Sequence, residues 1–191
     1  TALLASSHRR FSVGIQNEKN CMSIERSIAV YEDHVTKKQE EWDKLSNDEL
    51  LSWERRLAES IIFKQSNENL RKKLLLERNP WMDWYHFPCD FHPKALRLLH
   101  GRLGIEEQYP LTDVVMVPCL YEKGLREIPI VDMQIKALRM LQECPMAYGD
   151  LGTKLIDAYT LKSEESVCSW RKIVERQIAE LIFKGVLVVK S

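Results

Sequence analysis

The sequence lacks the features that most often identify a function directly. It has only seven glycines and none of them cluster, which excludes a glycine-rich phosphate loop, a dinucleotide fingerprint and a Gly-x-Ser-x-Gly nucleophile turn. No apolar run approaches the roughly 18 residues of a membrane-spanning helix. Basic and acidic residues are equal in number, 28 of each. Because proteins that clamp a phosphate backbone usually present a basic face, direct nucleic-acid binding and contact with ribosomal RNA are not favoured.

The chain also has no Cys-x-x-Cys pair. Its five cysteines are an odd number and are widely spread, a pattern typical of reduced thiols rather than of a disulfide framework. The mitochondrial matrix and the cytosol fit this pattern, whereas secretion and the intermembrane space fit it poorly.

The first dozen residues give the clearest indication of where the protein is located. Ala2–Ser12 contains arginines, serines and apolar residues but no acid, which is the composition of a mitochondrial presequence. Arg9-Arg10-Phe11-Ser12 also resembles the sites at which matrix peptidases cut. We therefore expect residues 1–20 to be presequence-like or a disordered N-terminus, and the protein to lie in the matrix or on the matrix face of the inner membrane.

Residues 21–79 are expected to form a helical arm or hairpin. An apolar stripe recurs every three or four residues, at Ile24, Ile28, Tyr31 and Val35. A second helix should begin at Ser46, because Glu49 follows three residues later and completes a capping box. These stripes are narrow, which suggests that the arm needs a partner to cover it.

Residues 80–130 are expected to be an irregular segment rich in aromatic residues and proline. Pro80–Pro88 holds five aromatic or imidazole rings between two prolines. Rigid rings are common interface anchors, although the chain's own core would bury them equally well. We predict a protein interface made of these rings and one helical tryptophan: Trp53, Trp81, Trp84, Tyr85 and Phe87.

The rest of the middle segment is predicted in less detail. Pro93 suits the start of a short helix that Gly101 would end. Further on, Pro110, Pro118 and Pro129 argue against a regular central strand. A short hairpin turning near Glu122-Lys123-Gly124 and an extended crossing over another subunit both fit the sequence.

Residues 131–191 are expected to form a compact helical domain ending in a strand. Three helices are predicted, from Asp132, around Leu151 and from Ser163, and Gly185 is placed to end the last of them. Three helices followed by the strand Val186–Val189 resemble the order of a winged-helix domain, which implies nucleic-acid binding. The second wing strand of that fold has no counterpart after the strand.

His86, Cys89 and His92 are the only candidates for a metal site. Their residue types and two-residue gaps suit zinc, but a second pair of ligands is missing and prolines stiffen the loop. We expect no bound metal, no cofactor and no catalytic residue.

The piece Trp42–Glu49, followed by Trp53 and Arg55, is similar to the matrix-side helical segment of cytochrome c oxidase subunit 4. It also resembles the second helix of the HMG box. The first resemblance implies a membrane span and the second a basic domain. This chain has neither, so neither family is assigned.

Taken together, the sequence predicts a mainly α, non-catalytic accessory subunit of a mitochondrial multiprotein assembly that binds other protein subunits. A respiratory-chain or ATP synthase complex is the first choice. The alternatives are a peripheral mitochondrial ribosomal protein and a winged-helix nucleic-acid-binding protein.

Overall fold

The computed structural model describes residues 21–104, 111–119, 124–159 and 164–190. The predicted presequence lies outside these residues. The elements in chain order are α1 (Ile24–Asp43), α2 (Asn47–Gln65), α3 (Glu68–Lys73), β1 (Leu75–Arg78), β2 (Asp83–His86), α4 (Pro93–Leu103), β3 (Asp113–Cys119), β4 (Gly124–Pro129), α5 (Asp132–Glu143), β5 (Met146–Ala147), α6 (Tyr148–Asp157), α7 (Glu164–Phe183) and β6 (Leu187–Val189).

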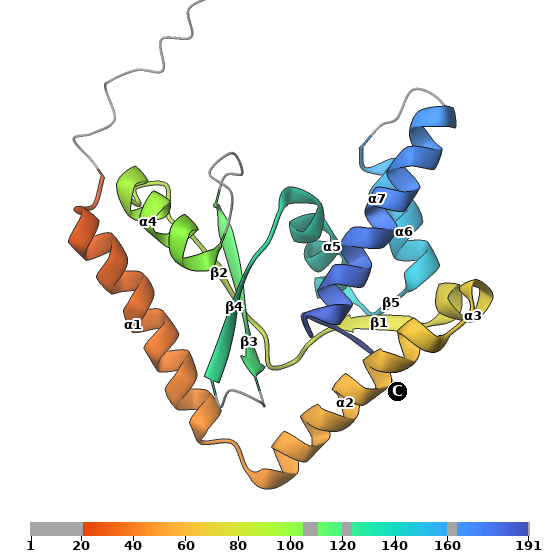
Figure 1. The fold of residues 1–191 in the computed structure, drawn as a ribbon, viewed down its shortest axis with the longest axis horizontal. Coiled ribbons are helices and arrows are strands. Elements are labelled where there is room, and N and C mark those ends of the chain that lie inside the picture. Colours follow the sequence, from red (N-terminus) through yellow and green to blue (C-terminus); the bar gives the residue numbers. More distant parts are fainter. Residues whose placement is uncertain (1–20, 105–110, 120–123, 160–163, 191) are drawn as a thin grey trace, which may run out of the picture.

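The expectation of a mainly α protein is wrong. The helices are accompanied by two three-stranded antiparallel sheets, with strand orders β5-β1-β6 and β2-β3-β4, so the fold is mixed α/β. Figure 1 shows α1 and α2 as the two arms of a V, with both sheets and the helices α4 to α7 between them and α3 at the end of the α2 arm. None of the helices in the described ranges is long and apolar enough to cross a membrane.

The start of α2 confirms the predicted capping box. The backbone N–H of Ser46 donates to Glu49 Oε2 at 2.8 Å, and the N–H of Glu49 donates to Ser46 Oγ at 3.4 Å. The predicted arm contains the helices α1, α2 and α3, but Leu75–Arg78 is the strand β1 and not the end of a helix. The arm is also covered by its own chain, because α1 buries Tyr31 against the sheet β2-β3-β4.

The predicted irregular segment contains that sheet, so this expectation is also wrong. The apolar run Val114–Val117 is buried on both faces of β3. Val114 and Met116 pack toward α1 and α4, whereas Val115 and Val117 pack toward the C-terminal helices.

Pro118 and Pro129 do not prevent a central strand, because the first lies beyond the part of β3 that pairs on both sides and the second lies on an edge strand. Pro110 lies outside the described residues. β2 pairs with β3 only between Asp113 and Met116, so Pro118 lies beyond it and faces β4 alone. Pro129 ends β4, which is an edge strand. The strands β3 and β4 form a hairpin, whose turn at 120–123 lies outside the described residues.

The short helix α4 forms as predicted but ends later. The ring of His92 accepts a hydrogen bond from the backbone N–H of Lys94 at 3.1 Å and caps the helix. The helix continues through Gly101 to Leu103 and is capped by Gly104, whose φ of +67° is the left-handed conformation that favours glycine. Gly185, at φ +75°, follows α7 as predicted.

The C-terminal segment is not the expected helical domain. Its strands β5 and β6 do not pair with each other, because β1 lies between them: Leu76 is opposite Met146 on one side and Val189 on the other. The central strand of this sheet therefore comes from far upstream. A self-contained helical domain at 131–191, with its winged-helix resemblance, is overturned by this pairing.

Candidate protein interface

The five predicted anchor rings occupy different environments. Trp53 is 1% exposed and Phe87 is 5% exposed, so the chain's own core buries both of them. Trp81, Trp84 and Tyr85 are half-buried. Only these three keep surface that a partner could contact.

Trp81 lies in the connection between the two sheets, which Asn79 holds in place. Asn79 is buried, and its side-chain amide donates to the backbone oxygen of Gly185 at 2.8 Å. Its side-chain oxygen accepts the N–H of Trp81 at 2.9 Å. We call residues 80–84 the Trp81–Trp84 segment; both ends are fixed, one by Asn79 and the other by pairing of β2 with β3.

A groove of about 250 Å³ lies on the α1 side of this segment. The ring of Trp81 meets that of Trp42 edge-on, with centroids 6.4 Å apart. The polar rim includes Lys38, whose ammonium bonds Glu41 at 2.7 Å and lies 3.5 Å from Asp83. The hydrogen bond to Glu41 and the charge of Asp83 raise the pKa of Lys38. The groove therefore combines an aromatic wall with a charged rim.

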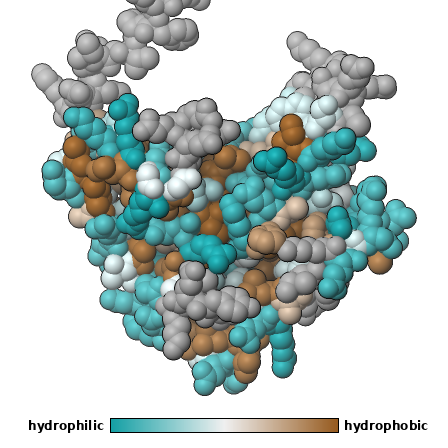
Figure 2. All heavy atoms as spheres, in the orientation of Figure 1, coloured by the Kyte–Doolittle hydropathy of each residue, from teal (hydrophilic) through white to brown (hydrophobic). Residues whose placement is uncertain are grey.

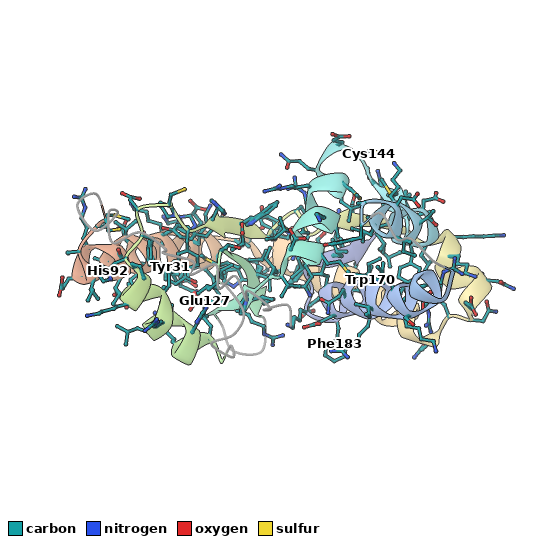
Figure 3. All side chains as sticks on the ribbon, turned by 90° about the horizontal axis from the view of Figure 1, so that it is seen from above. Tyr31, His92, Glu127, Cys144, Trp170 and Phe183 are labelled. Atoms are coloured by element: carbon teal, nitrogen blue, oxygen red, sulfur yellow. The ribbon has the colours of Figure 1, made fainter. Side chains whose placement is uncertain are left out.

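A second groove, of about 340 Å³, lies on the other side of the segment. Trp84 lines it together with the end of α5 and Cys144, an exposed thiol. Figure 3 shows Cys144 on the side of the molecule opposite Phe183. The two tryptophans of the segment thus each line a different groove.

Asp113 organises the β2 end of the segment. Its carboxylate is buried, at 3% exposure, and its Oδ1 accepts the indole N–H of Trp84 at 2.7 Å. The same oxygen is 3.0 Å from Nδ1 of His86. Sequence reasoning missed Asp113. The sequence feature that could have identified it is the position of this carboxylate directly before the apolar run Val114–Val117.

Tyr85 lies on the face of β2 opposite to that of Trp84. Its ring lies edge-on to Tyr31 at 5.2 Å and 4.7 Å from the ring of His34. Nε2 of His34 is 2.5 Å from the carboxylate of Asp83. Burial raises the pKa of Tyr85. This ring therefore ties β2 to α1 and offers less free surface than the two tryptophans.

The three metal candidates are not brought together as ligands. His86 pairs with Asp113, His92 caps α4, and Cys89 is exposed. Among the residues that the structure describes, no group of three or more His, Cys, Asp or Glu side chains is placed to hold a metal ion.

Large apolar side chains are also exposed at scattered places elsewhere. Phe183 is 68% exposed and projects from α7 (Figure 3), and Leu98 and Leu51 are exposed on α4 and α2. Figure 2, which is drawn in the orientation of Figure 1, shows hydrophobic residues in separate places among hydrophilic ones. These single residues differ from the Trp81–Trp84 segment, where rings line grooves.

Comparison of the chain with family profiles, with curated proteins and with solved structures found no match.

Proposed function

We propose that this protein is a non-catalytic accessory subunit of a mitochondrial multiprotein assembly, and that it docks onto a neighbouring subunit through the Trp81–Trp84 segment. A respiratory-chain or ATP synthase complex, on its matrix side, is the assembly that we favour. The presequence-like composition of residues 2–12 supports the location.

The observation that carries the proposal is the placement of Trp81 and Trp84. Each ring is half-buried, and each lines a separate groove beside one short segment. The backbone between them is fixed by Asn79 and by β2. A preorganised aromatic pair loses little conformational entropy on binding, and such rings supply much of the energy at interface centres.

The even charge favours protein partners over RNA. With 28 residues of each sign, the chain has no net excess of cations to release counterions from a phosphate backbone. The alternative, a peripheral protein of the mitochondrial ribosome, would dock in the same way but sediment with ribosomal particles.

The test replaces both rings at once. A tagged Trp81→Ala/Trp84→Ala variant should be imported and folded but should leave its high-molecular-weight assembly on native gels of mitochondrial extracts. The wild-type protein should co-migrate with a respiratory complex or ATP synthase. The matched control is Leu51→Ala/Leu98→Ala, which removes two exposed apolar side chains outside the grooves.

Circular dichroism of the purified variants separates loss of docking from loss of fold. If the tryptophan variant has wild-type helix content and stays in the assembly, the anchor assignment is wrong. A wild-type protein that migrates as a monomer, or that is found outside mitochondria, contradicts the proposed function itself.

A further inference from the structure

The strand β2 forms one edge of the sheet β2-β3-β4, because it pairs only with β3. The N–H of Phe87 donates to the backbone oxygen of Thr112 at 2.9 Å, which continues this pairing by one residue. Residues of an antiparallel strand turn their backbone groups alternately toward one neighbour and the other. Phe87 and Tyr85 therefore face β3, and the N–H and C=O groups of Trp84 and His86 point away from it.

These outward backbone groups have no partner in the described part of the chain. Among the described elements, only β3 runs along β2. The strand at the other edge of the sheet is different, because α1 and α4 contact β4 and its last residue, Pro129, has no N–H to offer. An uncovered strand edge is complementary to one kind of occupant, another extended chain.

The groove beside Trp84 provides space for a side chain of such an added strand. Residues directly opposite each other on neighbouring strands place their side chains on the same face of the sheet. A residue paired with Trp84 would therefore lie on the face where Trp84 lines the groove of about 340 Å³. Met82, Leu141 and Pro145 also line this groove, so it suits a large apolar side chain.

The same groove contains a cation that lacks a carboxylate partner. Arg78 lines the groove and is half-buried. Its neighbour Glu77 pairs with Arg56 at 2.9 Å, and Arg78 itself forms no ion pair within the described ranges. The other carboxylate of the lining, Glu143, is exposed. A half-buried guanidinium is satisfied best by a carboxylate, which indicates an acidic residue in the occupant.

We propose that an extended segment of the partner subunit adds a strand to the edge of β2 and pairs with the backbone of Trp84 and His86. The residue opposite Trp84 is large and apolar and fills the groove, and an acidic residue of the same segment bonds Arg78. This inference rests on the proposed function, because it names the kind of segment that docks beside the two tryptophans.

Amide hydrogen exchange at single-residue resolution, in the native assembly and in the purified full chain, tests the pairing directly. We expect the N–H groups of Trp84 and His86 to exchange at least tenfold more slowly in the assembly, because each gains an acceptor. The N–H of Tyr85 already faces β3 and is the reference that should change less. Equal exchange of the two outward groups in both samples would overturn the added strand.

The purified chain also distinguishes the possible occupants of the edge. If its Trp84 and His86 N–H groups are already protected, a second copy or another segment of the same chain covers β2, and the assignment to a partner subunit is wrong. Analytical ultracentrifugation of the same sample tells these two occupants apart.

A matched pair of variants at His86 isolates the backbone contribution. His86→Pro removes the outward N–H, and edge strands accept proline where the N–H faces away from the sheet. His86→Ala removes the ring and its contact with Asp113 but keeps the N–H. We expect the proline variant to leave the assembly on native gels and the alanine variant to remain. Equal behaviour of the two would contradict backbone pairing; if circular dichroism shows that the proline variant is unfolded, the exchange measurement alone decides.

The acidic residue of the segment is tested by Arg78→Gln, which should lower the fraction of the protein that stays in the assembly at least tenfold. Lys184→Gln is the control, because its charge pairs with Glu180 outside the groove. Wild-type retention of the Arg78 variant would show that no carboxylate bonds Arg78.

Failure of the added strand can be told from failure of the proposed function. If Trp81→Ala/Trp84→Ala leaves the assembly but exchange and the His86 pair give the contrary results, only the added strand is wrong. If the folded tryptophan variant stays in the assembly, the docking segment itself is wrong.

Discussion

Tyr31 lies where α1, α4 and β4 meet, and Figure 3 shows it beside Glu127. Its hydroxyl donates to Glu127 at 2.6 Å, and Arg102 bonds the same carboxylate at 2.6 and 2.9 Å. The guanidinium also lies over the tyrosine ring, 5.7 Å from its centroid. The Glu127 carboxylate of β4 thus binds a donor from α1 and a donor from α4. The donor from α1, Tyr31, is completely buried.

Burial and the bond to Glu127 raise the pKa of Tyr31 above its usual value of 10.0. Between that value and the folded pKa, the folded chain holds a proton that the unfolded chain has lost. Stability therefore falls as the pH rises above about 10, by at most about 1.4 kcal/mol per pH unit for this one group. Below that pH its contribution is complete.

Tyr31→Phe should lower the free energy of unfolding by about 1 to 3 kcal/mol at neutral pH, since a hydrogen bond to a charged acceptor is lost. It should also make the alkaline decline shallower by one proton. Tyr148, whose pKa is also raised, keeps some decline in the variant. Urea unfolding from neutral pH to about pH 11 measures both effects. If the free energy of unfolding declines equally steeply with pH in the wild-type protein and in the variant, this account of Tyr31 is contradicted.

At the scale of elements, the start of α2 was predictable because its cap is local. Ser46 and Glu49 satisfy each other's backbone donors. Ser46→Ala should cost about 1 kcal/mol of stability, measured by urea unfolding. The control Ser52→Ala changes an exposed residue inside α2 and should not destabilise, because alanine is the better helix former. Equal losses in both variants would show that the cap contributes nothing specific.

Strand β1 could not be predicted from its own residues. Leu74, Leu75 and Leu76 continue the leucine spacing of the helices before them, so the local pattern indicates a helix. The strand forms because Leu76 can pair with β5 and β6, which follow much later in the chain. Strand propensity depends on such neighbours more than on local sequence.

Only part of the candidate interface could be predicted, because burial of a ring also depends on residues that are distant in the sequence. The rings of Trp81 and Trp84 stand out between prolines in the sequence, and the structure leaves both only half-buried beside grooves. In the sequence, Trp53 and Phe87 could not be distinguished from these two tryptophans as anchors. The structure covers both of them with residues that are distant in the chain. Asn79 and Asp113 were missed because their partners, Gly185 and Trp84, are also distant in sequence.

At the scale of the whole molecule, the two halves of the chain share one core. Val115 and Ile128 of the sheet β2-β3-β4 pack in the same cluster as Leu138, Leu151 and Ile178 of the C-terminal helices. The other sheet also draws its central strand from the first half of the chain. Neither half can therefore complete its core alone.

It follows that the isolated segment 131–191 should not fold. Without β1, the strands β5 and β6 have no partner, and the apolar face of the C-terminal helices stays exposed to water. We expect dispersed amide resonances and a cooperative thermal transition for the full chain and neither for the fragment. A fragment that melts cooperatively would show that these residues form a domain of their own.

The central claim, that Trp81 and Trp84 dock onto another subunit, is tested most directly by hydroxyl-radical footprinting of the native protein in mitochondria against the purified chain. We predict that the peptide carrying both tryptophans is oxidised several-fold less in mitochondria, because a partner covers its rings. Equal oxidation of that peptide in the two samples would contradict the claim.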